Sequence, residues 1–410
     1  MAKATNRRLL VHSLCLALAF LLLTAGAAMA RPGGPTKRES AGRVSAFGGR
    51  IKVAHARALG AKCASRRAAR TQITSPRRRC APAAASRTPQ PLYWGATIGP
   101  QITGSQAPWD MNAVSRFEEI SHKPASIIQF FQPFAECGGS SCSFFSFPTT
   151  PLENIRQHGS IPVLSWSSQS IPSSLEEPDF QLSDVIEGRY DAYISDFASQ
   201  AAAWGHPFFI RFNWEMNGNW FPWSEGVNGN GPGQYVAAWR HVHDLFVAAG
   251  ASNVSWVWCP FVDPGSSLQG LASLYPGDAY VDWTGLDGYN WGTNPSSARG
   301  WKSFDQLFSR SYGEIAEGIA PSKPMMIGEV GSSEQGGSKA AWIQNALATV
   351  PTEYPKIRAL LWFDKYDDGM DWPLETSTAA SAAFAEGIQD PMYVGNSYAE
   401  VPGGPIQPPI

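Results

Sequence analysis

Eight short apolar segments recur along residues 91–390, and they constrain the fold more than any other feature of the chain. The segments are Leu92–Ile98, Ala125–Phe131, Ile161–Trp166, Pro207–Asn213, Val254–Cys259, Val281–Asp287, Pro324–Val330 and Arg358–Asp364. Several are nearly continuous in apolar residues, as strands buried on both faces are. Polar loops and longer amphipathic stretches separate them. The pattern predicts eight strands that alternate with helices.

Two of the intervening stretches show a helical period. Residues 235–249 place Val236, Trp239, Val242, Leu245 and Phe246 on one stripe, and residues 338–348 form a second candidate. Eight strand–helix units within roughly 300 residues fit a single (β/α)8 TIM barrel. An open doubly wound sheet is the alternative, but no GxGxxG or GxxxxGK[ST] loop follows an early segment. We therefore predict an α/β barrel domain over residues 90–390.

The first thirty residues have the pattern of a secretory signal peptide. Arg7 and Arg8 precede the apolar run 9–23, and Ala28-Met29-Ala30 has the small-x-small form of a cleavage site. A membrane anchor is the alternative, but this run is short against the roughly 20 residues that span a bilayer. The pattern predicts a secreted, extracellular protein.

Residues 31–89 form a basic segment with 15 Lys and Arg and a single acid, Glu39. Without a sustained apolar period the segment cannot bury enough surface to offset its ordering entropy. We predict a disordered arm, which either associates with an anionic cell-wall polymer or serves as a solvated propeptide or linker. The tail 391–410, which contains Pro402-Gly403-Gly404-Pro405, is predicted as an extended coil.

The charge of the body differs from that of the arm. Residues 91–410 hold 14 basic against 33 acidic residues. A groove that binds a nucleic-acid duplex needs a basic face to neutralise phosphates, so this body is not expected to bind nucleic acid. A nucleic-acid role would depend on the arm alone.

The cysteines indicate structure rather than catalysis. Cys137 and Cys142 bracket a flexible Gly-Gly-Ser-Ser loop, which predicts a short loop-closing disulfide in an oxidising compartment. Cys63 and Cys80 could pair within the arm, and Cys259 is expected to be a buried free thiol. No CxxC motif or His/Cys cluster has metal spacing, so we predict no metal and no cofactor. The acids at 364–371 are interpreted as a solvated loop rather than a calcium site.

Two glutamates lie where a barrel carries its chemistry. Reactive groups emerge at the C-terminal ends of barrel strands, and Glu215 and Glu329 lie at the ends of the fourth and seventh predicted strands. Cleavage of a glycosidic bond needs one carboxyl to protonate the leaving oxygen and one to attack or to activate water. Both could instead be salt-bridge partners, for example of Arg211. Because two such groups occur together among Trp and Tyr residues, we predict a catalytic pair.

Aromatic residues on the predicted mouth loops indicate a sugar-binding surface. Flat C–H faces of sugar rings pack well on aromatic rings. Each such tryptophan singly could belong to the core, whereas several at one rim indicate subsites. Asp263 and Asp287 either serve the site or cap loops. The predicted substrate-contacting residues are Arg211, Trp214, Asn217, Trp220, Trp223, Tyr289, Trp291 and Trp362.

Three segments resemble glycoside hydrolase family 26, whose members are retaining (β/α)8 glycosidases. They are Glu215-Met216-Asn217-Gly218 with Trp220, Gly285-Leu286-Asp287-Gly288-Tyr289, and Ile327-Gly328-Glu329. The resemblance covers nearly all of residues 91–390. It implies that Glu215 is the acid/base, Glu329 the nucleophile and Tyr289 the hydrogen-bond partner of the nucleophile. It further implies that Trp220 and Trp362 lie against the sugar.

The resemblance implies a β-linked polysaccharide as substrate, and most family members are endo-β-1,4-mannanases. It therefore favours a secreted retaining endo-β-1,4-mannanase, with a β-1,3-1,4-glucanase or a β-1,3-xylanase as alternatives. One position departs from the family, because Trp214 stands where a histidine usually precedes the acid/base. This departure weakens the mannan assignment. It is also the one sign in favour of a non-catalytic carbohydrate-binding barrel.

Overall fold

The computed structural model describes residues 88–139, 141–262, 270–294 and 299–410. The predicted signal peptide, the arm up to residue 87, the Cys63–Cys80 pair and Asp263 lie outside these residues. Among the described helices, none combines the length and apolar character that crossing a membrane requires.

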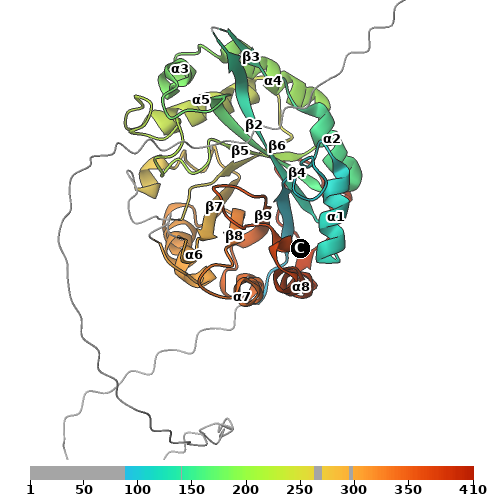
Figure 1. Ribbon diagram of the computed structural model, residues 1–410. Helices are drawn as coiled ribbons and strands as arrows, with labels where there is room; N and C mark the ends of the chain where they lie inside the picture. Colours follow the sequence, from blue (N-terminus) through green and yellow to red (C-terminus); the bar gives the residue numbers. More distant parts are fainter. Residues whose placement is uncertain (1–87, 140, 263–269, 295–298) are drawn as a thin grey trace, which may run out of the picture. The chain divides into compact units, whose positions relative to one another are not determined.

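Eight parallel strands close into a barrel (Figure 1). Each strand pairs with the next one along the barrel, and β1 pairs with both β9 and β2, which completes the ring. This closure confirms the predicted (β/α)8 barrel, and all eight apolar segments form its strands. The strands are β1 (Leu92–Ile98), β2 (Ile127–Gly138), β4 (Ile161–Ile171), β5 (Phe208–Phe212), β6 (Val254–Trp258), β7 (Trp283–Asn290), β8 (Met325–Ser332) and β9 (Ile357–Asp364).

Helices surround the strands (Figure 1). The predicted helices at 235–249 and 338–348 are confirmed as α5 and α7, and α7 continues to Glu353. Between β6 and β7, the described residues contain a 3₁₀ turn, Leu271–Leu274, in place of an α-helix. The helices are α1 (Met111–Ser121), α2 (Thr149–His158), α3 (Leu182–Ile186), α4 (Asp191–Trp204), α5 (Gln234–Ala248), α6 (Phe304–Gly313, continued by a π-helical turn to Ile319), α7 (Lys339–Glu353) and α8 (Thr378–Gly387).

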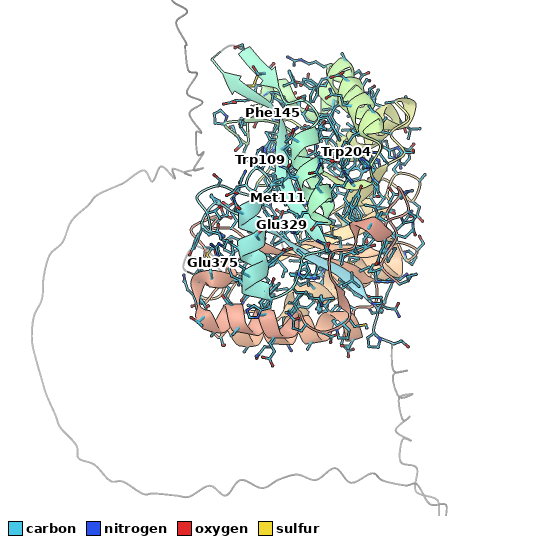
Figure 2. All side chains as sticks on the ribbon, turned by 90° about the vertical axis from the view of Figure 1, so that its right-hand side faces the viewer. Trp109, Met111, Phe145, Trp204, Glu329 and Glu375 are labelled. Carbon is cyan, nitrogen blue, oxygen red and sulfur yellow. A yellow bond between two sulfur atoms is a disulfide. The ribbon has the colours of Figure 1, made fainter. Side chains whose placement is uncertain are left out.

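Side-chain caps and apolar stripes explain where these helices form. Ser303, Ser338 and Ser377 precede α6, α7 and α8, and each accepts a hydrogen bond from a backbone N–H of the first turn. The stripe of α5 turns Trp239, Val242 and Phe246 toward the strands. Figure 2 shows the side chains that fill the layer between helices and strands.

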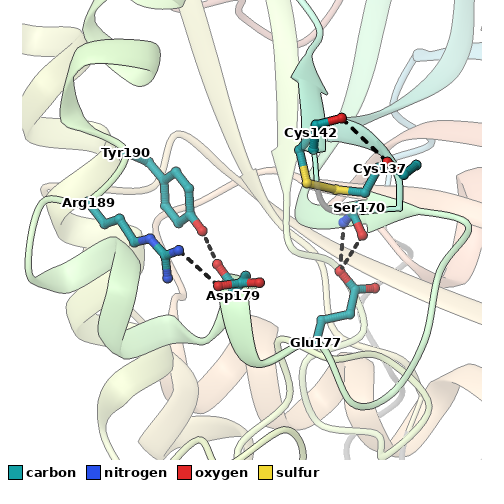
Figure 3. The surroundings of a disulfide bond; sticks show 9 residues. Cys137, Cys142, Ser170, Glu177, Asp179, Arg189 and Tyr190 are labelled. Atoms are coloured by element: carbon teal, nitrogen blue, oxygen red, sulfur yellow. Dashed lines mark hydrogen bonds and ion pairs between the residues drawn. A yellow bond between two sulfur atoms is a disulfide. The ribbon is translucent and has the colours of Figure 1, made fainter.

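A disulfide-closed hairpin extends β2 beyond the barrel. β2 turns back into the antiparallel strand β3 (Ser141–Phe144), and Cys137 pairs with Cys142 across the two strands. Their sulfur atoms are bonded, which confirms the predicted disulfide (Figure 3). Nearby, the Glu177 carboxylate accepts hydrogen bonds from the Ser170 and Ser174 amides at 2.7 and 3.0 Å and so ties the loop after β4 to that strand.

The C-terminal segment packs against the barrel. Residues 401–410 contain no helix or strand, as predicted, but a short strand and a 3₁₀ turn, Tyr398–Glu400, precede them. β10 (Tyr393–Val394) pairs with the start of β1, and Tyr393 is buried. Further on, Ile406 is also buried, its carbonyl accepts a hydrogen bond from Trp283 Nε1, and its amide donates to Ser255 Oγ. The apolar side chains of this segment explain the packing, because they cover the strand ends opposite the barrel mouth.

Candidate active site

Three carboxyl groups converge at the C-terminal ends of the strands. Glu215 lies three residues after β5, Asp287 lies in β7, and Glu329 lies in β8. Each offers an oxygen atom within 4.8 Å of the others. Asp287 is fully buried, whereas Glu215 and Glu329 keep 6% and 5% of their surface exposed. The two predicted glutamates therefore lie together at the mouth, with oxygen atoms no farther apart than the ~5–5.5 Å between the carboxyl groups of retaining glycosidases.

A strained turn after β5 directs Glu215 into the barrel mouth. Asn213 and Glu215 have φ angles of 43° and 53°, a left-handed conformation that side chains other than glycine disfavour. Hydrogen bonds hold this turn in place. The Asn213 side chain accepts from the Ser168 amide and donates to Ser168 Oγ, at 2.9 and 2.8 Å. The Glu215 amide donates to the Cys259 carbonyl at 2.8 Å.

A β-bulge brings Asp287 beside Glu329. Leu286 pairs with Ile327, but the next residue of β7, Asp287, pairs with Glu329, so β8 carries one extra residue there. That residue is Gly328. A Cβ at this position would lie 2.7 Å from Asp287 Oδ1 and 2.9 Å from Arg211 Nη1. Only glycine therefore lets the two charged groups approach the strand this closely.

Arg211 holds two of the three carboxylates. Its Nη1 donates to Asp287 Oδ2 at 2.5 Å, and its Nη2 donates to Glu329 Oε1. Tyr289 donates its hydroxyl to the other oxygen of Glu329. Both oxygens of Glu329 are thus held by hydrogen-bond donors, one of which carries a positive charge. Because Arg211 is fully buried, the prediction that it contacts substrate is wrong, and it binds carboxylates instead.

Glu215 has a different electrostatic environment. Burial raises its pKa well above the ordinary range, and the negative charges of Asp287 and Glu329 add to this effect. A hydrogen bond from Trp220 Nε1 to Glu215 Oε2, 2.5 Å long, opposes the rise in part. Arg211 donates its hydrogen bonds to the other two carboxyl groups. Glu215 is therefore the member of the pair that retains a proton.

Asp287 belongs to the charge network, which settles the choice that the sequence left open. Burial raises its pKa to about 8, while the adjacent guanidinium of Arg211 acts in the opposite direction. Cys259 also donates to Asp287, with Sγ 3.2 Å from Oδ1, and is the buried free thiol that was predicted. Neither the place of Asp287 in this network nor the hydrogen bond from Cys259 could be derived from strand position alone.

Two predicted tryptophans lie at the mouth. Trp220 is partly exposed beside Glu215 and packs edge-on against Phe261 at 5.3 Å between ring centroids. Trp291 is also partly exposed and lies 6.3 Å from the ring of Tyr289. These rings line one side of the opening above the carboxyl groups.

Three other predicted contact residues are buried and are held by hydrogen bonds to the backbone. Trp223 and Trp362 are 0% and 2% exposed, and each donates its indole N–H to a backbone carbonyl. Their assignment as sugar platforms is wrong because neighbouring aromatic rings cover them. Asn217, 1% exposed, exchanges two hydrogen bonds with the backbone of Phe261 and holds the loop that carries Glu215.

Trp214 forms an aromatic cluster with two residues that sequence reasoning missed, Phe131 and Phe221. Its ring centroid lies 5.2 Å from that of Phe131 and 5.4 Å from that of Phe221, both partly exposed. The guanidinium carbon of Arg211 lies 5.0 Å from the centre of its ring. Phe131 is the last residue of a predicted strand, and this position could have indicated that it lies at the barrel mouth.

The positive charge of Arg211 balances part of the negative charge of the acidic residues at the site. Among the described residues, Glu215, Asp287 and Glu329 are the acidic group with metal-ligand spacing. Arg211 already occupies oxygens of two of them, so the donor set suits a guanidinium rather than a metal ion. After β9, Asp364 is fully buried and accepts a hydrogen bond from the Leu374 amide at 2.8 Å, so the interpretation of this acid as part of a solvated loop is wrong.

A (β/α)8 barrel whose mouth pairs two carboxyl groups between aromatic walls has the architecture of a glycoside hydrolase. The comparison with known families agrees. Residues 114–344 match the family described as glycosyl hydrolase family 26. The chain belongs to glycoside hydrolase family 26.

Similar proteins include enzymes named for different polysaccharides. Endoglucanase H of Acetivibrio thermocellus is 36% identical over 302 residues, which cover 72% of this chain but 30% of that protein. A mannan endo-1,4-beta-mannosidase of Bacillus subtilis is 27% identical over 213 residues, or 49% of this chain and 51% of the relative. The chain thus spans about a third to a half of the length of these relatives.

Solved structures share the fold. An endo-beta-1,4-mannanase of Cellulomonas fimi superposes with a TM-score of 0.56 at 20% identity, over 76% of this chain and 73% of that one. The family 26 domain of a Prevotella bryantii endo-beta-mannanase/endo-beta-glucanase gives 0.53 at 17% identity, over 75% and 91%. At these identities the likeness establishes the barrel and its strand order.

Proposed function

We propose that the protein is a retaining glycoside hydrolase that cleaves internal bonds of a β-linked glucan. One observation carries the proposal: two carboxyl groups face each other within 4.8 Å, and Arg211 and Tyr289 bind only one of them. This asymmetry gives the two groups different protonation states. Double displacement needs one ionised nucleophile and one protonated acid at this spacing.

In the first step, a carboxylate oxygen of Glu329 attacks the anomeric carbon and forms a glycosyl ester. The bond to the leaving oxygen breaks as Glu215 delivers its proton to that oxygen. Arg211 and Tyr289 hold Glu329 ionised and oriented before the attack. Trp220, bonded to Glu215, places the acid on the side from which the leaving group departs.

In the second step, water replaces the enzyme at the anomeric carbon. Glu215, now ionised, accepts a proton from the water as its oxygen attacks. The ester bond to Glu329 breaks, and the carboxylate returns to Arg211 and Tyr289. Two displacements at one carbon give a product with the original anomeric configuration. The site returns to its starting state of protonation.

Similarity supports a glucan as the first candidate substrate. Endoglucanase H is the relative of higher identity and of wider coverage of this chain, 36% and 72% against 27% and 49% for the mannosidase. Trp214, in place of the histidine usual in the family, offers a single N–H donor next to the acid/base and adds apolar bulk. A β-1,4-mannan is the second candidate, favoured by the named mannanases among the relatives and structures.

We also propose that the protein acts outside the cell. The Arg-led apolar run and the Ala-Met-Ala site support export, and the disulfide between Cys137 and Cys142 suits an oxidising compartment. The basic arm could then hold the enzyme on an anionic wall polymer. Mass spectrometry of the culture supernatant measures the mature N-terminus. A mature chain retained in the cytoplasm with Met1 intact would contradict export.

A substrate screen tests the proposed activity. Reducing ends released from mixed-linkage β-1,3-1,4-glucan, carboxymethyl-cellulose, galactomannan and β-1,3-xylan are compared at equal enzyme, with Glu329→Gln as the inactive control. We expect a β-glucan to be cleaved at least about tenfold faster than galactomannan, a difference of about 1.4 kcal/mol in the barrier. Faster cleavage of galactomannan would show that mannan, and not glucan, is the substrate. Retention on a polymer without any cleavage would establish a binding barrel instead.

A further inference from the structure

Cys259 contacts the charged residues of the site through both its side chain and its backbone. It follows β6 directly and is fully buried. Its Sγ lies 3.2 Å from Asp287 Oδ1 and 3.7 Å from Arg211 Nη1. Its carbonyl oxygen accepts the amide of Glu215 at 2.8 Å. One residue therefore contacts both the carboxylate that Arg211 holds and the backbone of the predicted acid/base.

The neighbouring strands leave a fitted space for this thiol. A Cβ on Gly285 of β7 would lie 2.7 Å from Cys259 Sγ, and a Cβ on Gly328 of β8 would lie 3.0 Å from it. Real Cβ atoms essentially never come as close as the first distance, and the second is tighter than most real contacts, so a larger residue at either position would press on the sulfur. An apolar side chain could fill such a niche, but it would leave Asp287 Oδ1 without this donor.

The thiol is held in its protonated form. Burial raises the pKa of Cys259 well above its ordinary value, and the negative charge of Asp287 adds to the rise. A protonated thiol is a weak donor, and Asp287 Oδ1 is the acceptor within reach. The other oxygen of Asp287 accepts from Arg211, so the two donors share the carboxylate.

We propose that Cys259 is a positioning residue, whose S–H donates to Asp287 and favours its ionised form beside Arg211. The negative charge on Asp287 in turn favours the protonated form of Glu215. This role rests on the proposed function of Glu215 as the acid. Cys259 acts through Asp287 and has no contact with the substrate in this scheme.

The charged and titratable groups around Cys259 determine in which direction its loss would shift the pH dependence of hydrolysis. Arg211 of β5, Asp287 and Tyr289 of β7, Glu329 of β8 and Glu215 surround the network. Tyr235 of α5 also lies near enough to interact electrostatically with Cys259, and burial raises its pKa well above the ordinary value, so it stays neutral. Two cations face the cluster: Arg211 from β5, and Arg299, which interacts electrostatically with Glu215 and lies over the ring of Phe261.

Removing the S–H donor should shift the pH dependence of hydrolysis. Without the thiol, the carboxylate form of Asp287 loses a hydrogen bond and its pKa rises. Asp287 then keeps its proton up to higher pH and repels the ionised form of Glu215 less. The pKa of Glu215 falls, so the acid loses its proton sooner as pH increases. The alkaline limb of kcat/KM should therefore move to lower pH.

Three variants test this in the full chain. The pH profile of kcat/KM on the polysaccharide that the wild type cleaves is compared for Cys259→Ala, Cys259→Ser and Val257→Ala. Val257 is a buried residue of the same strand and controls for loss of packing. We expect a downward shift of the alkaline limb by about half a pH unit or more in Cys259→Ala. In Cys259→Ser, which keeps a donor, and in Val257→Ala, the limb should stay within about 0.2 unit of the wild type. An unshifted limb in Cys259→Ala, or equal shifts in Ala and Ser, would overturn the proposal.

An infrared measurement separates this proposal from the catalytic one. The S–H stretch of Cys259 is isolated as the difference between wild-type and Cys259→Ser spectra, and it needs neither activity nor the Ala variant. We expect a band at the lower frequency of a hydrogen-bonded thiol, which moves upward in Asp287→Asn. A band at the frequency of a thiol without such a bond would overturn the proposal even in an active enzyme. A wild type that cleaves no β-glycan would instead overturn the proposed function.

Discussion

An oxygen of Glu215 lies within 4.8 Å of an oxygen of Glu329, although strands β6 and β7 separate their strands in the sheet. Closure of the barrel makes this possible, because inward-facing groups from non-adjacent strands meet over its axis. Arg211 binds Glu329 and Asp287, and Trp220 binds Glu215. Closure of the barrel brings the two glutamates together, and their different hydrogen-bond donors support the proposed roles of nucleophile and acid.

Removal of the acid should depend on the leaving group. Glu215→Ala is expected to lower kcat/KM on the polysaccharide about 10²- to 10⁴-fold, the usual contribution of a general acid. An aryl β-glycoside with a strongly acidic phenol needs little protonation, so its first step should lose much less. The burst of phenol release measures that step. Glu187→Ala, at an exposed surface position, is the control. Equal losses on both substrates would mean that Glu215 is not the acid.

The hydroxyl of Tyr289 should contribute through the nucleophile. Tyr289→Phe removes the donor to Glu329 and keeps the ring. A hydrogen bond to a charged group is worth about 1.5–3 kcal/mol, so we expect kcat/KM to fall roughly 10- to 150-fold. Steady-state kinetics measure the loss. Tyr275→Phe, whose hydroxyl bonds to Asp278 at the surface, should retain wild-type rates. A Tyr289→Phe enzyme with undiminished kcat/KM would rule out this role.

Trp220 should move the pH profile in the direction opposite to Cys259. Its indole N–H stabilises the ionised form of Glu215 and so lowers the pKa of that carboxyl. In Trp220→Phe this pKa rises, Glu215 keeps its proton to higher pH, and the alkaline limb of kcat/KM moves upward. Rates measured from pH 4 to 10 give the limb. A downward shift would show that Trp220 does not act on Glu215 as the geometry indicates.

Lys339 should stabilise the loop after β9, residues 371–376, to which it is hydrogen-bonded. Its fully buried Nζ donates to the carbonyls of Asp371, Trp372 and Pro373 and to Thr376 Oγ1, at 2.6 to 3.1 Å. Lys339→Met removes these four hydrogen bonds, and only the Trp372 and Pro373 carbonyls keep other donors, from Trp362 and Thr376. The change should lower the free energy of unfolding by about 2–4 kcal/mol. Equilibrium urea unfolding measures this. Lys356→Met, which loses one exposed bond to Pro321, should change it by less than about 1 kcal/mol. Similar losses in both variants would contradict the assignment.

The strands and the two glutamates could be predicted because their signals are local. An apolar run between loops indicates a buried strand wherever it occurs, and strand ends indicate the mouth. Strand β3 and the full length of β2 escaped prediction because Ser141–Phe144 is polar and exposed, and only its pairing with β2 makes it a strand. Strand β10 escaped prediction because a strand of two residues is too short to show an alternation of apolar and polar residues.

The depth of side chains in the mouth could not be predicted. Trp220 and Trp223 lie three positions apart in one loop, yet the first is partly exposed and the second is fully buried against Trp214 and Phe221. Arg211 was expected to meet substrate, but an alternation of side chains along β5 turns it into the barrel. The bulge at Gly328 and the left-handed turn at Glu215 are set by contacts between strands that no single segment encodes.

Trapping of the covalent intermediate tests the central claim most directly. The enzyme is treated with a 2-deoxy-2-fluoro-β-glucoside oligosaccharide that carries an activated leaving group, and the labelled peptide is located by mass spectrometry. We predict a single glycosyl ester on Glu329, absent from Glu329→Gln. A label on Glu215 or Asp287, or turnover of this reagent with an inverted product and no label, would contradict the account.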